Sequence, residues 1–253
     1  ARHAVHDTPA QGATPSTDPA ALGSARNTAT PPCIDDILRP HRIEVTLLDP
    51  SPSVTGCDEP LRPKHLAVLA YLALYRSADI EAVRRTFWPD SPSASSSNNT
   101  ISAIRTKLGD NSKGEPLLAS QRQGQLTLSA EVGSDWTRLC RLTSELPADS
   151  PPEEQIPLLV AALNLVAGPP GAAGSLDNWD WLRAEATGSG LIATAVRRVA
   201  DRLVVLAQHL QRPDLVDWAT AQANLVGDYD PPDETTIGHA PPLRVVAGGA
   251  NDS

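Results

Sequence analysis

Apolar residues recur at helical spacing in successive segments of the first half of the chain. The segment Leu66–Tyr75 is apolar nearly all round, as expected of a central helix that its neighbours cover, and Pro63 suits the start of that helix. Asp79 is well placed to cap a second helix. The apolar residues of that helix form one stripe: Ile80, Val83 and Phe87. Both helices are therefore predicted to bury one side in a common core.

A third helix is predicted between a Ser- and Pro-rich turn over residues 90–97 and Gly109, which suits a C-cap. Its aliphatic residues share one stripe: Ile101, Ile104 and Leu108. Its opposite side carries short side chains that donate and accept hydrogen bonds: Ser95, Asn99, Ser102 and Thr106. A helix with these two sides is shaped to lie in the major groove of DNA. The same polar face also suits plain water.

Two short β segments follow the third helix. Residues 117–120 and 126–131 are typical of strands, and the Gly-containing segment 121–125 is typical of the turn between them. Three helices followed by a hairpin are the order of a winged helix. Arg122 lies in the predicted turn, where it forms the tip of the wing.

The segments that flank this region differ in composition. Upstream, an alternating stretch precedes a turn over residues 49–53 and predicts a small sheet: Ile43, Val45 and Leu47. Residues 1–39 are predicted to be a disordered leader, because the first 33 or so carry almost no large apolar side chains. Residues 236–253 are rich in Pro and Gly and are predicted to be a disordered tail.

Apolar periodicity in the second half of the chain predicts a run of helices. A short helix is predicted after residue 134 and contains Leu139 and Leu142. Ordered structure is predicted to resume at Trp179 and Trp181. Three longer helices are predicted over residues 153–166, 191–210 and 213–226. The last two carry small residues where paired helices would cross: Ala195, Ala200, Ala207, Ala219 and Ala223. Such pairs resemble tetratricopeptide packing, although no clean repeat period is present.

The predicted fold is therefore mainly α with small β elements. A winged helix-turn-helix domain is expected over residues 40–132 and a tetratricopeptide-like α-helical repeat domain over residues 134–235. Charge is divided unevenly between them, because residues 62–125 contain nine basic and five acidic side chains. That segment carries +4 in a chain of net charge -9, which is the modest electrostatic footprint expected of a DNA-binding region.

The sequence favours a cytoplasmic location. No apolar run approaches the ~18 residues that a membrane-spanning helix needs, and the N-terminus has no signal-peptide pattern. The three cysteines are far apart, which fits a reducing compartment: Cys33, Cys57 and Cys140. We expect no membrane contact by this segment itself. The absence of an initial Met also fits a chain cut from a longer protein, so a membrane anchor outside this segment stays open.

Motifs for catalysis and for metal or cofactor binding are absent from the sequence. The cysteines and the six histidines show no zinc-ligand spacing. There is no nucleophile elbow, no P-loop and no dinucleotide-binding glycine motif. The chain is therefore predicted not to be an enzyme and to need no cofactor and no metal.

Several runs of the chain resemble a family of bacterial transcription regulators. Three runs are similar to the response-regulator type of winged helix. They are residues 61–90 (LRPKHLAVLAYLALYRSADIEAVRRTFWPD), residues 98–110 (NNTISAIRTKLGD) and residues 124–142 (GQLTLSAEVGSDWTRLCRL). Residues 158–170, 179–186 and 198–234 are similar to the bacterial transcriptional activator domain. This pair of domains is found in the actinomycete antibiotic regulatory proteins, including a subgroup associated with lysin-motif membrane proteins.

The resemblance implies a regulator that binds double-stranded DNA and uses its helical repeats to form a homodimer or to contact RNA polymerase or another protein. By residue matching, five residues of the third helix face DNA: Asn99, Ser102, Arg105, Thr106 and Lys107. Asn99 suits a bidentate bond with adenine, and Arg122 in the wing suits the adjacent backbone or minor groove. Recognition helices of the family commonly carry more arginines, so the grip on DNA is expected to be weak.

Other interpretations stay open at this point. The exposed polar helix face and the pair Arg84 and Arg85 are also typical of solvated surfaces, and Trp179 and Trp181 are more typical of core than of a partner-binding anchor. The alternative function is a signalling or adaptor module, in which a degenerate winged helix and the repeats bind proteins and not DNA.

Overall fold

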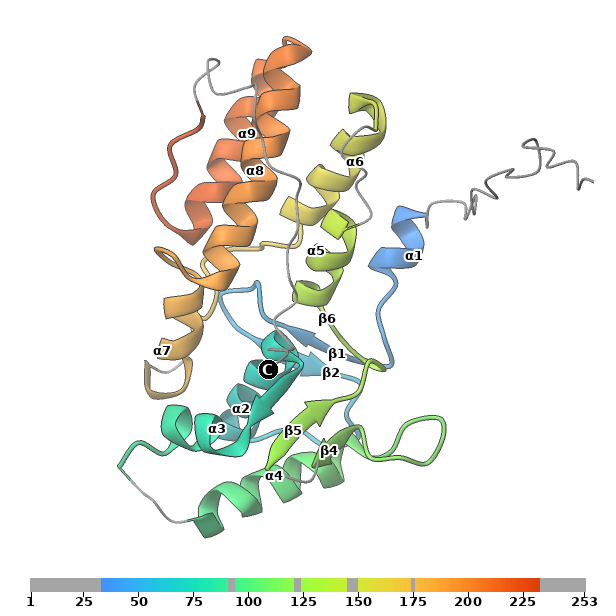
Figure 1. The fold of residues 1–253 in the computed structure, drawn as a ribbon, viewed down its shortest axis with the longest axis vertical. Coiled ribbons are helices and arrows are strands. Elements are labelled where there is room, and N and C mark those ends of the chain that lie inside the picture. Colours follow the sequence, from blue (N-terminus) through green and yellow to red (C-terminus); the bar gives the residue numbers. More distant parts are fainter. Residues whose placement is uncertain (1–32, 91–93, 121–123, 145–149, 174–175, 233–253) are drawn as a thin grey trace, which may run out of the picture. The chain divides into compact units, whose positions relative to one another are not determined.

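Three helices and a hairpin follow one another in the computed structural model, in the order that the sequence predicts (Figure 1). The structure describes residues 33–90, 94–120, 124–144, 150–173 and 176–232. The three helices are α2 (Pro63–Tyr75), α3 (Ile80–Phe87) and α4 (Ala94–Leu108). The hairpin consists of β4 (Leu118–Ser120) and β5 (Gln125–Leu128), which pair antiparallel.

The starts and ends of these helices follow from local chemistry. Pro63 is the first residue of α2, and the Asp79 side chain accepts hydrogen bonds from the Glu81 and Ala82 backbone N–H groups at the start of α3, as predicted. Gly109 follows α4 with a φ of 71°, which glycine adopts without strain. The prediction of a turn over residues 90–97 is wrong in part, because α4 already begins at Ala94. Five consecutive Ser and Asn residues, 95–99, join the helix despite their modest helical propensity.

Two three-stranded sheets complete the first half. One has the order β3-β5-β4, in which β3 (Ser77–Asp79) pairs antiparallel with β5. The other has the order β2-β1-β6. Here β1 (Ile43–Thr46) pairs antiparallel with β2 (Ser53–Thr55), as predicted, and parallel with β6 (Val132–Ser134). The strands β3 and β6 were not predicted.

A short helix, α1 (Ile34–Leu38), lies within the predicted leader, so that prediction is wrong for these residues. The helix is held by one buried side chain, since Ile37 is 1% exposed. The rest of the leader up to residue 32 and the predicted tail 236–253 lie outside the described residues.

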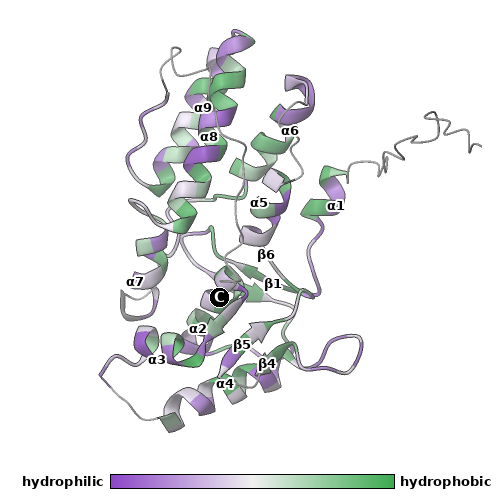
Figure 2. Cartoon of the chain, viewed as in Figure 1, coloured by the Kyte–Doolittle hydropathy of each residue, from purple (hydrophilic) through white to green (hydrophobic). Residues whose placement is uncertain are grey.

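The second half is helical, as predicted. It comprises α5 (Asp135–Ser144), α6 (Pro152–Leu163), α7 (Leu176–Glu185), α8 (Leu191–His209), α9 (Pro213–Ala223) and the 3-10 turn Asn224–Val226. Helices α8 and α9 pack against each other, and the five alanines predicted at their crossing are all buried. Hydrophobic and hydrophilic residues alternate along both helices in Figure 2, consistent with helices that bury one side.

Helix α2 joins the two halves of this core, because it contacts α4 on one side and α5 and α7 on another. The Tyr75 hydroxyl donates a hydrogen bond to the Glu185 carboxylate, 2.6 Å away. The ring of Tyr71 packs edge-on against Phe87 and Trp181. Trp179 is 5% exposed, which confirms the prediction that it is a core residue. No helix in the described ranges combines the length and hydrophobicity needed to cross a bilayer.

Candidate nucleic-acid interface

Helix α4 has one buried and one exposed side, as the sequence predicts. The three aliphatic residues of its inner stripe, Ile101, Ile104 and Leu108, are at most 4% exposed. The predicted polar face is solvent-exposed at Asn99, Ser102 and Thr106. None of the described elements covers these three side chains, and Figure 1 shows α4 running along the edge of the fold below α2. The geometry therefore leaves a face of hydrogen-bonding groups open to a partner.

Arg105, predicted to reach DNA, is held within the fold. Its Nε donates a hydrogen bond to the Leu118 carbonyl, 2.8 Å away in β4. This contact ties the β4 strand of the hairpin to α4. The residue stays partly exposed. It serves mainly to position the hairpin.

Lys107, the other predicted cation, is also engaged by the protein. Its Nζ donates to the Pro60 carbonyl at 2.6 Å and lies 3.4 Å from the Glu59 carboxylate, and its side chain is 21% exposed. A cation already paired with a carboxylate gives less attraction to phosphate than a free one. Lys107 therefore stabilises the loop before α2 and adds little net charge to the face.

Arg84 is not part of a solvated face, contrary to the sequence-based interpretation. Its Nε donates to the Ser97 hydroxyl at 2.9 Å, and its guanidinium also bonds the Asn98 side chain at 3.1 Å and pairs with Glu81. These bonds tie α3 to the first turns of α4. Arg85, its neighbour, is exposed, as predicted. Sequence reasoning missed Arg84 because its partners lie on another helix.

Arg84 gives a direct test of how α4 is positioned. We expect R84A to lower the free energy of unfolding by about 1 to 2 kcal/mol, because the two hydrogen bonds from its partly buried guanidinium to α4 are lost together with the pair to Glu81. Urea unfolding followed by circular dichroism measures the change, and hydrogen exchange should show faster opening at the start of α4. The matched control, R85A, should stay within about 0.5 kcal/mol of the wild type. Equal losses in both variants would contradict the positioning role.

A groove of about 530 Å³ lies between the start of α2 and the middle of α4. Its lining includes Asn99, Arg62, His65, Lys107 and Glu59. Burial lowers the pKa of His65, and the charges of Arg62 and Lys107 lower it further, so its imidazole is neutral at physiological pH. The exposed Arg62 guanidinium is thus the main cation of the groove. Its position beside Asn99 suits contact with a phosphate of a strand that crosses α4.

Arg122 lies outside the described residues, while Ser120 and Gln125, which flank the hairpin turn, are exposed. Within the part of the chain that the structure describes, no group of three or more His, Cys, Asp or Glu side chains could hold a metal ion.

No protein-family model and no curated protein matches this chain.

Proposed function

We propose that this chain is a DNA-binding regulator of transcription, built as a winged helix followed by tetratricopeptide-like repeats. In this proposal α4 enters the major groove, and the β4–β5 hairpin contacts the neighbouring backbone as the wing. Helices α5 to α9 contact RNA polymerase, another protein or a second copy of the chain. This is also the function that the resemblance to the bacterial activator family implies.

The observation that carries the proposal is the two-sided burial of α4. Its inner stripe is packed, whereas Asn99, Ser102 and Thr106 stand exposed on one side. Asn99 is the residue suited to read a base, since a bidentate bond with adenine contributes about 1 to 3 kcal/mol of discrimination. Arg62 in the adjoining groove supplies phosphate contact. Few free cations surround this face, so we expect binding to be weak at physiological salt.

The proposal is tested by titrating the full chain with a pool of random duplexes at low salt, and with the tightest-binding sequences selected from that pool. We expect S102E to weaken binding about tenfold or more, because it places a negative charge on the exposed face of α4. We expect R62A to reduce the slope of log affinity against log salt by about 1, because one phosphate contact is lost.

Two control variants match these changes away from α4. Ser189 is another exposed serine, which lies just before α8, and Arg198 is an exposed arginine on α8. The variants S189E and R198A should bind duplex DNA as the wild type does. The proposal fails if the wild type shows no duplex affinity at low salt, or if the control variants lose as much affinity as S102E and R62A.

One observation favours the adaptor function as the second candidate. Both cations predicted for the polar face are engaged within the protein, Arg105 with the Leu118 carbonyl and Lys107 with Glu59. An exposed helix face with uncharged side chains also suits a protein partner. The adaptor function predicts no measurable duplex binding at low salt, so the titration above separates the two.

A further inference from the structure

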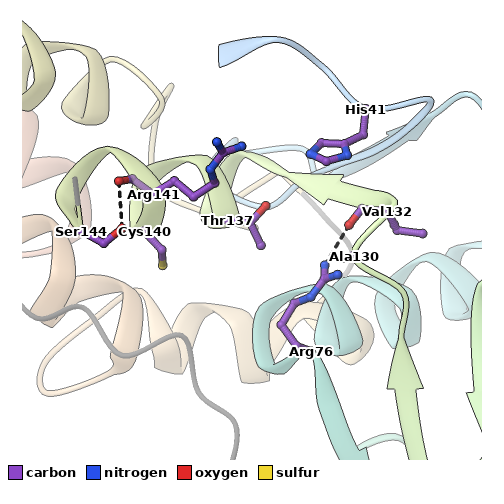
Figure 3. Close-up of a pocket in the computed structure, with 8 residues that line it drawn as sticks. All are labelled: His41, Arg76, Ala130, Val132, Thr137, Cys140, Arg141 and Ser144. Atoms are coloured by element: carbon purple, nitrogen blue, oxygen red, sulfur yellow. Dashed lines mark hydrogen bonds between the residues drawn. The ribbon is translucent and has the colours of Figure 1, made fainter. Parts of the chain in front are cut away.

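A second cleft of about 530 Å³ lies between α5 and the C-terminal end of α2 (Figure 3). Its lining comes from four places in the chain: His41 shortly before β1, Arg76 just after α2, the segment from Ala130 to the start of β6, and one side of α5. None of the residues that line it lies on α4. The cleft is therefore separate from the candidate DNA interface.

Arg76 forms one wall and holds an unusual backbone conformation. Its φ is 62°, a left-handed value that costs a residue with a side chain about 1 to 2 kcal/mol. Its guanidinium donates to the carbonyls of Val132 at 2.8 Å and Ser129 at 2.6 Å. These acceptors are uncharged, and burial lowers the pKa of Arg76 with no carboxylate nearby to oppose the effect. The positive charge is thus hydrogen-bonded, and no carboxylate in the described ranges forms an ion pair with it.

Arg141 lies on the opposite side of the cleft. It is exposed on α5, and Figure 3 shows its side chain extending along the helix toward His41. Neither Arg76 nor Arg141 takes part in an ion pair among the described residues. The lining residues include no acid. Two guanidinium groups and one imidazole therefore line the cleft, and the Glu44 carboxylate, which accepts the His41 backbone N–H, is already paired with Arg138.

The remaining walls are neutral. Ala130 and Val132 line the cleft, as does Cys140, which is 7% exposed. Burial raises the pKa of the Cys140 thiol to about 12, so the thiol stays protonated at physiological pH. The volume lies within the range of about 300 to 1,000 Å³ that small-molecule sites occupy. Apolar walls with few charged groups are typical of such sites.

We infer that this cleft binds a small organic anion, with a carboxylate or phosphate group held between Arg76 and Arg141 and an apolar body against Val132 and Cys140. Guanidinium groups recognise these acid groups through paired, charge-assisted hydrogen bonds. An occupant in this position connects α5 to the end of α2, the helix against which α4 packs. The site thus has the location of an effector pocket between the two halves of the molecule.

The test is titration of the full chain, without DNA, with phenyl phosphate, benzoate, inorganic phosphate and benzyl alcohol, followed by two-dimensional NMR and thermal unfolding. We expect saturable binding of phenyl phosphate or benzoate, with shifts at Thr137, Cys140 and Val132. The aromatic acid that binds more tightly identifies the acid group. Inorganic phosphate and benzyl alcohol should each bind at least about tenfold more weakly, because each lacks half of the contacts.

The variant R141A should weaken binding of the aromatic acid about tenfold, because one charged contact is lost. Its effect on folding is small, since the side chain is exposed. R141K should recover part of the affinity, and the control R198A should bind like the wild type. Absence of saturable binding up to millimolar probe, or an equal loss in R198A, would overturn the inference. Because no DNA is present, this result is separate from that of the duplex titration.

Discussion

E44Q is expected to lower the free energy of unfolding by about 3 to 5 kcal/mol, the typical cost of removing one partner from a buried ion pair. Glu44 lies in β1 and contacts Arg138 of α5 at 2.5 Å, and the two side chains are 6% and 15% exposed. The change leaves the Arg138 guanidinium buried without a counter-charge. It also weakens the acceptor of the His41 backbone N–H, 3.1 Å from the carboxylate. Guanidinium chloride unfolding measures the loss.

A double variant separates the charge from the packing. E44M combined with R138M replaces the pair by apolar side chains of similar length, and buried pairs exchanged in this way often lose little stability. We therefore expect the double variant to be more stable than E44Q. Arg138 also donates to the Leu38 carbonyl at 3.1 Å, so the double variant, which lacks this donor, should open α1 in hydrogen exchange. A double variant that is less stable than E44Q would show that the pair itself stabilises the fold.

The elements that were predictable from the sequence are those whose stabilisation is local or periodic. The apolar stripes of α4 and α8 each repeat over several turns, and Asp79 and Gly109 mark helix ends through bonds to nearby residues. Such signals depend on the spacing of residues along the chain. For this reason the helices were found with boundaries close to those observed.

The elements that were missed are short and depend on distant partners. Strand β6 has three residues and pairs with β1, so that Ile43 faces Val132 across the sheet. Helix α1 has five residues and is fixed by the burial of Ile37. Three to five residues are too few to show a period. Their structure follows from packing that composition cannot reveal.

The candidate interface was predictable in outline but not in its charges. Exposure of Asn99, Ser102 and Thr106 follows from helical geometry once the buried stripe is known. Arg105 and Lys107 bond to residues that lie 13 and 47 positions away along the chain. Helical periodicity does not predict contacts over such separations. The ion pair of Glu44 was not predictable either. Alternation along β1 predicts that the Glu44 side chain points outward, and it does not indicate that Arg138 is its partner. Long-range pairing of polar groups decides how much charge remains for a partner.

D135A is expected to lower the free energy of unfolding by about 3 kcal/mol or more at pH 5, because three buried N–H groups lose their acceptor. The Asp135 carboxylate accepts hydrogen bonds at 2.8 Å from the backbone N–H groups of Leu47, Leu48 and Trp136. The residue is 5% exposed and joins the end of β1 to the start of α5. D135N keeps one acceptor oxygen and should lose less. Urea unfolding of the three proteins gives the comparison.

The same carboxyl group should make stability depend on pH. Burial raises the pKa of Asp135 to about 6 from 3.8, against the opposing effects of its three backbone donors and Arg138. Between these values the folded chain binds more protons than the unfolded chain, so stability is full below pH 3.8 and is lost as the pH rises through about 6. The loss is about 3 kcal/mol in all, and about 2 kcal/mol of it falls between about pH 4.5 and 7.5. D135N does not titrate, so its stability deficit relative to the wild type should shrink by that amount over the same range. A deficit that grows with pH would mean that the backbone donors outweigh burial and that the carboxylate is the favoured form inside the fold.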